Sequence, residues 1–164
     1  MSACDERAGM KEERRSVSRP SSVPPHPSSR MFKTTRRVEF RDTDAAGIMH
    51  FSVFFTAMES AECEFLRSLG LGVVMPDLAG QIAFPRVSAR CDYQSPLRFE
   101  DEYQIEVTAA RIGGTSVTYD FTFTFGQRAI AVGQMTSVCC RMSSDGTPTP
   151  IPIPESILQR LRDS

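Results

Sequence analysis

The sequence predicts an α+β domain in which one long helix packs on a curved five-stranded antiparallel sheet. Three observations lead to this fold class: one long helical pattern, several runs of alternating apolar and polar residues, and short connections between those runs. Alternation with a period of two is typical of strands with one buried face, and short connections imply antiparallel neighbours. One helix on one face of such a sheet is an economical way to bury both apolar surfaces.

Composition is that of a globular chain. Its 164 residues, 40% of them hydrophobic, suffice for one domain with a core. The net charge of -1 gives no general attraction to nucleic acid or to an anionic membrane, so we expect neither as a partner. No apolar run is long enough for a membrane span or forms a signal-peptide core.

The cysteines and histidines bear on metal binding and on compartment. Five cysteines, an odd number without a C-x-x-C pair, indicate reduced thiols and a cytoplasmic location. With only two histidines in the chain, a zinc site of the usual Cys/His kind is not expected, and we predict no metal.

The domain is expected to span residues 31–164. Residues 1–30 are rich in Ser, Pro, Arg and Glu and have no apolar periodicity, so we expect them to form a disordered tail. The first extended segment then runs from Phe32 to Phe40, with Phe32, Val38 and Phe40 on one side of the alternation.

The long helix is predicted from about Val53 to Leu69. Ser52 is a suitable N-cap, and Gly70 stands at a C-cap position. Apolar residues form a broad arc on one side of this helix, and Glu62 falls inside the arc. A buried Glu62 would need a partner for its charge.

The rest of the chain predicts four strands and a short helix. The turn between the second and third of these strands contains Gly113-Gly114, and the fourth, less regular strand spans about Ala129 to Met142. An extended Pro-rich segment and a helix from about Glu155 to Leu161 follow. The expected inward-facing residues are Val87, Ala89, Cys91 and Tyr93 in the first strand, Tyr103, Ile105, Val107 and Ala109 in the second, and Val117, Tyr119, Phe121, Phe123 and Phe125 in the third.

The segment V-E-F-R-D-T-D-A-A-G-I-M-H-F carries the chemistry. Asp42 and Asp44 lie two residues apart, beside Gly47 and just before the helix. Asp44 could serve as a base or a nucleophile, and the free amides at a helix start could donate to developing negative charge. On the residues alone, both aspartates could instead cap a turn.

This segment, with M-E-S-A-E-C-E-F-L-R-S-L-G in the helix and Y-Q-S-P-L-R-F-E-D before the middle strand, resembles the hot-dog-fold acyl-CoA thioesterases. The resemblance is to the 4-hydroxybenzoyl-CoA thioesterase family, which includes the YbgC- and FadM-like enzymes, and it spans about residues 32–142. It implies hydrolysis of an acyl-CoA thioester to the free acid and CoA, with no cofactor, because CoA is part of the substrate.

The resemblance also implies roles for particular residues. Asp44 matches the catalytic second aspartate of the D-x-D motif, and the backbone amide of Phe51 matches the group that polarises the thioester carbonyl. Glu59 stands at the acidic helix position, where it would orient the acyl group or the nucleophilic water, or pair across a dimer. We expect Gly47 and His50 to contribute to substrate binding.

Family resemblance further implies an oligomer. Members are homodimers whose sheets join edge to edge, with active sites at the subunit interface, and many pair again into homotetramers. The acyl-CoA substrate would therefore bind between subunits.

Two other functions stay open at this stage. His50 and Glu59 together would resemble the pair used by hot-dog hydratases and dehydratases, and the chain could also be a catalytically silent protein that binds an acyl thioester or serves in assembly. The residues do not choose between a general-base and a nucleophilic route for Asp44, nor do they identify the acyl group. Candidates for binding the CoA phosphates are Arg86, Arg90, Arg98, Arg111, Arg128 and Arg141.

Overall fold

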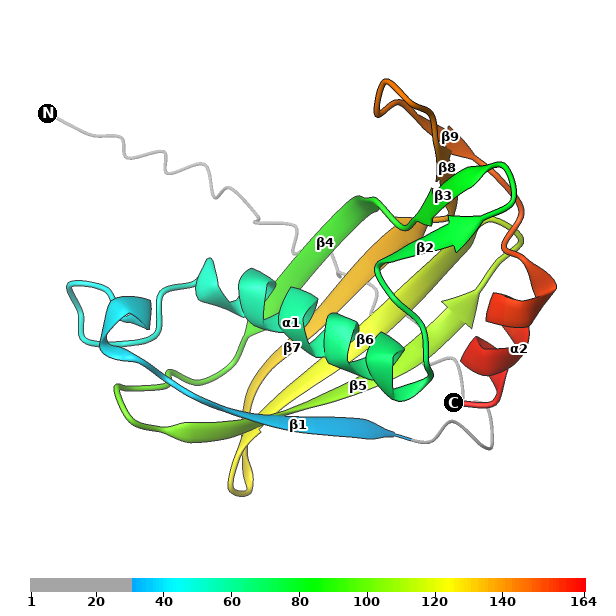
Figure 1. Cartoon of the computed structure of the whole chain (residues 1–164). Helices are drawn as coiled ribbons and strands as arrows, with labels where there is room; N and C mark the ends of the chain where they lie inside the picture. Colours follow the sequence, from blue (N-terminus) through cyan, green and yellow to red (C-terminus); the bar gives the residue numbers. More distant parts are fainter. Residues whose placement is uncertain (1–30) are drawn as a thin grey trace, which may run out of the picture.

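The computed structural model describes residues 31–164, and the tail predicted for residues 1–30 lies outside the described residues. The main sheet has five strands in the order β1-β5-β6-β7-β4, and all neighbouring strands are antiparallel (Figure 1). The strands are β1 (Phe32–Arg37), β4 (Arg86–Tyr93), β5 (Glu102–Ile112), β6 (Ser116–Phe125) and β7 (Arg128–Val138). This confirms the antiparallel five-stranded sheet predicted from the alternating runs.

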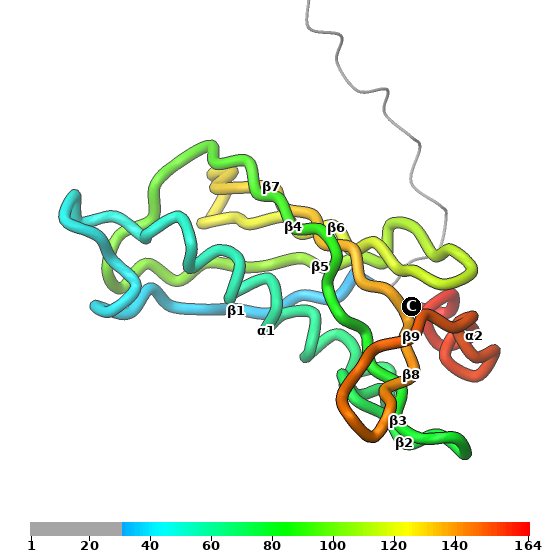
Figure 2. Tube along the Cα trace, turned by 90° about the horizontal axis from the view of Figure 1, so that it is seen from above, coloured from blue at the N-terminus to red at the C-terminus, as the bar shows by residue number. Residues whose placement is uncertain are grey.

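Helix α1 (Val53–Ser68) lies along one face of this sheet, as Figures 1 and 2 show. Its bounds agree with the predicted helix, and the chain leaves it through Gly70, whose φ of 68° favours a residue without a side chain. Phe54, Ala61 and Phe65 are buried against the sheet. The main core therefore lies between α1 and the inner face of the five strands.

Gly133 of β7 lets α1 lie close to the sheet. A Cβ atom added to Gly133 would stand 2.2 Å from Sδ of Met58 in α1, far inside van der Waals contact. The absence of a side chain at Gly133 is thus what makes room for Met58, which is fully buried.

The alternating patterns of the central strands are confirmed. Ile105 and Val107 of β5 and Tyr119, Phe121 and Phe123 of β6 are all buried. These strands have neighbours on both sides and α1 above them, so their inner faces are covered.

The prediction is wrong for β4. Val87 is 63% exposed and Tyr93 is 47% exposed, although both were expected to face the core. Because β4 is the last strand of the sheet and pairs only with β7, a polar-apolar alternation in its sequence does not guarantee that a layer covers it. Within the described residues the sheet edge at β4 is therefore unpaired, and apolar side chains are exposed along it.

The chain also departs from its predicted path before the acidic turn. Strand β1 ends at Arg37, and a short 3-10 helix η1 (Phe40–Asp42) follows. Val38 is fully buried as expected, but Phe40 is 79% exposed. The regular alternation fails at Phe40 because the backbone has already turned.

A second sheet of four strands was not predicted, so the single-sheet description is incomplete. Its order is β2-β3-β8-β9, and its strands are β2 (Val74–Asp77), β3 (Gly80–Ala83), β8 (Cys140–Met142) and β9 (Pro148–Pro150).

The second sheet continues two strands of the first. Strand β3 leads into β4 through Phe84-Pro85, and β7 leads into β8 through Cys139. The Val138 N–H donates to the carbonyl of Pro85 at 3.0 Å, which carries the ladder across this corner. The last strand expected from Ala129 to Met142 is therefore two strands.

Helix α2 (Glu155–Arg162), which was expected from about Glu155 to Leu161, follows β9 and buries Ile157. Nη1 of Arg160 donates to the carbonyl oxygens of Leu69 at 3.2 Å and Gly70 at 2.9 Å. These carbonyls at the end of α1 lack partners within the helix, so Arg160 satisfies them and holds α2 against the C-terminal end of α1. The acidic turn lies at the opposite end of α1 (Figure 1).

Candidate active site

The acidic turn is built by its own carboxylates. Oδ2 of Asp42 accepts from the backbone N–H of Glu39 at 2.9 Å and so caps η1. Oδ1 of Asp44 accepts from the N–H of Ala46 at 2.8 Å and from that of Ile48 at 3.4 Å. Asp42 thus has the capping role that aspartate favours, whereas Asp44 has only one of its two oxygens committed to the backbone.

Backbone bonds close the turn into a small hairpin. Thr43 and Met49 form an antiparallel bridge, and the N–H of Asp44 donates to the carbonyl of Ile48 at 2.9 Å. Gly47 adopts a φ of 72°, the left-handed conformation that a side chain would disfavour. Met49 in turn donates to the carbonyl of Leu97 at 2.8 Å, which fixes the turn to the segment before β5. Asp44 is therefore half-buried on a well-anchored loop.

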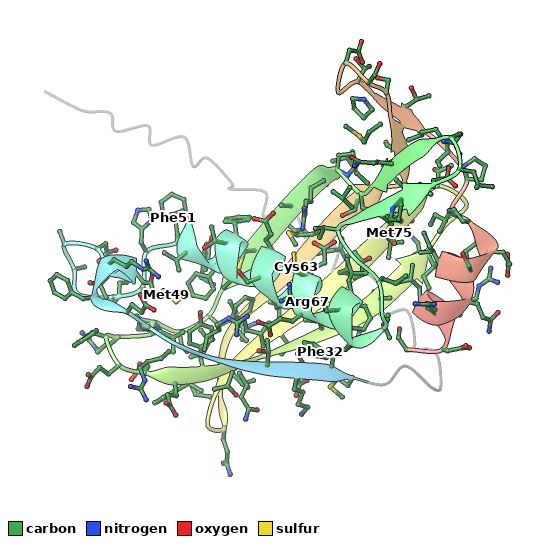
Figure 3. The ribbon with its side chains drawn as sticks, viewed as in Figure 1. Phe32, Met49, Phe51, Cys63, Arg67 and Met75 are labelled. Atoms are coloured by element: carbon green, nitrogen blue, oxygen red, sulfur yellow. The ribbon has the colours of Figure 1, made fainter. Side chains whose placement is uncertain are left out.

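Phe51 stands between this turn and α1, at the end of the helix where Figure 3 labels it beside Met49. Its backbone N–H makes no hydrogen bond within the described residues 31–164. Its carbonyl oxygen accepts from Oη of Tyr93 at 3.2 Å, and its ring is 60% exposed. The structure thus places an unused amide donor seven residues after Asp44. The carbonyl of the same residue, Phe51, is held by Tyr93 of the edge strand β4.

His50 and Glu59 are not brought together. Nδ1 of His50 lies 2.8 Å from Oγ of Ser52, and the His50 ring packs on Phe51 with centroids 4.4 Å apart. Glu59 instead pairs with Arg86 at 3.4 Å. Within a single chain, His50 and Glu59 therefore do not form the pair that a hydratase or dehydratase would use.

Ser52 stands at the predicted N-cap position of α1, but the capping hydrogen bond expected from its hydroxyl does not form. Its backbone angles are helical. Its hydroxyl is used by His50, so the first amides of α1 are not covered by a Ser52 side chain.

A buried ion pair beside Glu59 was not predicted. Glu62 is only 1% exposed, and its Oε2 accepts from Nη2 of Arg86 at 2.9 Å while its Oε1 accepts from Oγ of Ser137 at 3.4 Å. Burial raises the pKa of Glu62, and the contact with Arg86 opposes that shift. Burial alone would lower the pKa of Arg86, but Glu62 and Glu59 more than offset this, so Arg86 stays charged.

The sequence carried one signal for this pair. Glu62 lies inside the apolar arc of the helix and therefore demands a partner, but nothing in the sequence says that Arg86 provides it. Nε of Arg86 is buried and has no hydrogen-bond partner within the described residues, a condition that costs about 1–3 kcal/mol for a typical donor. Because Nε makes no such bond, the guanidinium is oriented by the contacts of its Nη1 with Glu59 and of its Nη2 with Glu62.

Two of the arginines considered for the CoA phosphates have carboxylate partners in the chain itself. Arg86 pairs with Glu59 and Glu62, and Arg141 pairs with Asp77 at 2.6 Å. Their charges are thus at least partly neutralised where they stand.

Exposed aromatic rings surround the acidic turn. Phe40 and Phe99 meet edge to face with centroids 6.0 Å apart, and Phe51 and Tyr93 are also strongly exposed. Such apolar surface at one end of a molecule is typical of a ligand or protein interface.

The arrangement defines a class of site. A carboxylate with one free oxygen and a nearby unused amide can activate a nucleophile and stabilise an oxyanion, which is what acyl transfer requires. Within residues 31–164 no group of three or more His, Cys, Asp or Glu side chains could hold a metal ion, and the metal-free site stays a prediction. Neither helix of this part of the chain combines the length and the hydropathy needed to cross a bilayer.

The comparisons with known proteins agree with this class. The sequence model of the thioesterase-like superfamily matches residues 38–161. A curated protein of Aquifex aeolicus, provisionally named an esterase, is 30% identical over 129 residues, which are 78% of this chain and 95% of that protein. A 1,4-dihydroxy-2-naphthoyl-CoA hydrolase of Synechococcus is 34% identical over 113 residues, 65% of this chain and 74% of its own length.

Solved structures share the fold. A gentisyl-coenzyme A thioesterase superposes with a TM-score of 0.69 at 29% identity and covers 79% of this chain and 99% of its own. The 1,4-dihydroxy-2-naphthoyl-CoA thioesterase of Synechocystis reaches a TM-score of 0.71 at 23% identity, covering 81% of this chain and 96% of its own. The hot-dog fold predicted from the sequence is thereby confirmed.

The chain therefore belongs to the thioesterase-like superfamily. It is a thioester hydrolase with a hot-dog fold.

Proposed function

We propose that the protein hydrolyses an acyl-CoA thioester to the free acid and CoA, with Asp44 as general base or nucleophile. One observation carries this proposal. Oδ1 of Asp44 is held by two backbone amides while the rest of the carboxylate stays uncommitted, and the unused N–H of Phe51 lies on the same loop. Membership in a superfamily of thioesterases supports the same chemistry.

In the general-base route, Asp44 takes a proton from a water molecule as that water attacks the carbonyl carbon. The C–S bond then breaks, and the proton returns to the departing thiolate of CoA. In the nucleophilic route, Asp44 itself attacks, CoA leaves, and water hydrolyses the mixed anhydride. Positioned general-base catalysis contributes about 10²–10⁴ in rate.

The Phe51 amide would act on the carbonyl oxygen in either route. That oxygen becomes negative in the tetrahedral intermediate, and a fixed N–H stabilises it without reorganising. Removing one such donor costs about 10²–10³ in kcat in well-studied acyl-transfer enzymes. Gly47 supports this geometry, because its left-handed turn returns the chain toward the helix start.

We further propose that the acyl group is aromatic and carries hydroxyl groups, as in the 4-hydroxybenzoyl branch of the family. The names of two relatives, a dihydroxynaphthoyl-CoA hydrolase and a gentisyl-coenzyme A thioesterase, support this substrate class. The exposed rings of Phe51 and Tyr93 beside the acidic turn offer surfaces on which an aromatic acyl group can pack. His50 would form part of the same wall.

The active form is proposed to be a homodimer joined along β4. An edge strand with exposed backbone groups and an exposed Val87 is prone to pair with another strand, and a second copy of β4 can satisfy it. A homotetramer would require a further interface, and sedimentation distinguishes the two assemblies.

The test is thiol release from a panel of CoA esters with hydroxylated aromatic, short-chain and long-chain acyl groups. Asp44→Asn keeps the size of the side chain but loses the base, so we expect kcat to fall by about 10²–10⁴. Asp120→Asn, on the outer face of β6, is the matched control and should retain full activity. His50→Ala should matter much less. An inactive His50 variant together with an active Asp44 variant would contradict the proposal, and a preference for unbranched chains would contradict the aromatic substrate class alone.

A further inference from the structure

The two halves of the proposed chemistry lie at opposite ends of one strand. Tyr93, the last residue of β4, bonds to Phe51 and so marks the Asp44 end. Arg86, the first residue of β4, pairs with Glu59. Strand β4 spans about 23 Å between these ends, and along α1 Glu59 lies eight residues after Phe51, about 12 Å, so Glu59 stands apart from the Asp44 site of its own subunit.

Antiparallel pairing of β4 from two subunits would bring these two ends close together. When two copies of β4 pair antiparallel, the Tyr93 end of one strand lies opposite the Arg86 end of the other. Glu59 and Arg86 of one subunit would then face Asp44 and Phe51 of its partner. In such a dimer each site would draw residues from both subunits.

Arg86 is suited to hold Glu59 at that interface. Its Nη2 is fixed by Glu62, which is buried and itself bonded to Ser137, while its Nη1 points to Oε1 of Glu59 at 3.4 Å. The Glu59 side chain is 55% exposed, so its carboxylate contacts Arg86 and is still accessible to a partner subunit. The ion pair thus converts a flexible surface glutamate into one with a preferred direction.

We propose that Arg86 is a positioning residue that acts in trans: anchored by Glu62, it directs Glu59 toward the Asp44 site of the partner subunit. There the Glu59 carboxylate accepts a hydrogen bond from the water that attacks the acyl carbon or the mixed anhydride. This inference rests on the proposed thioesterase function and on the dimer along β4. Arg86 does not touch the substrate and acts through Glu59.

The first experiment is a double-mutant cycle. Arg86→Lys keeps the charge but cannot bridge both carboxylates. We expect kcat to fall about tenfold with KM changed less than about twofold, because the water and not the substrate is misplaced. In a Glu59→Gln background the same Arg86→Lys change should lower kcat by less than about twofold, since the group it positions is gone. Equal losses in both backgrounds would overturn the positioning role.

Arg67→Lys is the matched control. Arg67 lies on α1, is exposed and makes no ion pair within the described residues. Its replacement should leave kcat unchanged, whereas a loss equal to that of Arg86→Lys would show that the effect is not specific to Arg86.

The second experiment uses dimers of two differently tagged subunits, one with Asp44→Asn and one with Arg86→Lys. If Arg86 acts in trans, one site carries both defects and the other carries none, so the mixed dimer should have about half of the wild-type activity. If Arg86 acts within its own subunit, the activity should be about a twentieth of wild type, half that of the Arg86→Lys homodimer. The second result would overturn the proposal.

Glu59→Gln keeps the test decisive where Arg86→Lys disturbs folding. Glu59 is exposed and its loss leaves the Arg86–Glu62 pair in place, and a mixed dimer with Asp44→Asn should again recover about half of the wild-type activity. Failure of the proposed function has a different signature, an Asp44→Asn homodimer that remains active.

Discussion

Oη of Tyr93 donates a hydrogen bond to the backbone carbonyl of Phe51 at 3.2 Å. This bond joins the free edge of the sheet to the loop that carries the proposed oxyanion donor. The Tyr93 ring also packs against Phe54, with centroids 5.1 Å apart, so the start of α1 is held from two directions. These two contacts of Tyr93 therefore hold strand β4 against the loop that contains Phe51 and against the start of α1.

Tyr93→Phe should weaken catalysis more than stability. The ring contact with Phe54 remains, but the carbonyl of Phe51 loses a hydrogen bond worth about 0.5–1.5 kcal/mol. If that bond orients the Phe51 amide, kcat should fall by roughly two- to tenfold. Thiol-release kinetics and thermal unfolding check this, and an unchanged kcat would show that the bond does not orient the amide.

Gly133→Ala should destabilise the fold. The new Cβ would meet Sδ of Met58 at 2.2 Å, so α1 or the Met58 side chain must shift. Overpacking of this kind costs about 1–3 kcal/mol, and the flexibility of methionine favours the lower part of that range. Gly114→Ala, where no atom lies within 4 Å of the added Cβ, is the control. Urea denaturation would contradict the prediction if both variants unfolded at the same concentration.

Acid should weaken the contact between β2 and β8. A hydrogen bond from Arg141 lowers the pKa of Asp77 below its ordinary value of 3.8. Because the pKa is lower in the folded state, the stabilisation is complete above the unfolded pKa and is lost as the pH falls through the folded pKa. Asp77→Asn should therefore lower Tm at pH 7 and make no difference well below pH 3.8. A difference that persists in strong acid would exclude the carboxylate as its cause.

Val87→Lys should abolish the dimer and most of the activity. Val87 is 63% exposed on the edge strand, so the change leaves the core intact but places a charge where a second β4 would pair. Val132→Lys, on β7 and 40% exposed, introduces the same charge away from this edge and should leave the dimer intact. Sedimentation and kcat measured on the same samples decide the matter, and a fully active Val87→Lys monomer would refute the shared site.

Local patterns predicted the parts of the fold that are locally determined. Gly70 ends α1 as expected, and the buried alternation of β5 and β6 follows from central strands with a helix above them. The D-T-D-A-A-G segment predicted a tight turn before a helix, and its backbone bonds form that turn. In each case consecutive residues carry the pattern from which the element was predicted.

The features missed by sequence reasoning depend on distant residues. Val87 is exposed because no strand lies beyond β4, which its own alternation cannot reveal. Strands β2 and β9 are only four and three residues long and contain proline, so their sequences carry no alternating signal. Arg86 and Glu62 lie 24 residues apart and meet only because β4 passes beside α1.

The corner formed by Phe84-Pro85 and Cys139 has a consequence for amide hydrogen exchange. Because β3 and β8 are continuous with β4 and β7, they cannot separate from the main sheet as a unit without breaking ladders that extend into it. Protection should therefore decline as a gradient and not in a step, lowest in the outer strands β2 and β9 and highest in β6 at the centre of the main sheet. We therefore expect limited proteolysis to cleave first at the outer strands of the small sheet, before the two sheets separate.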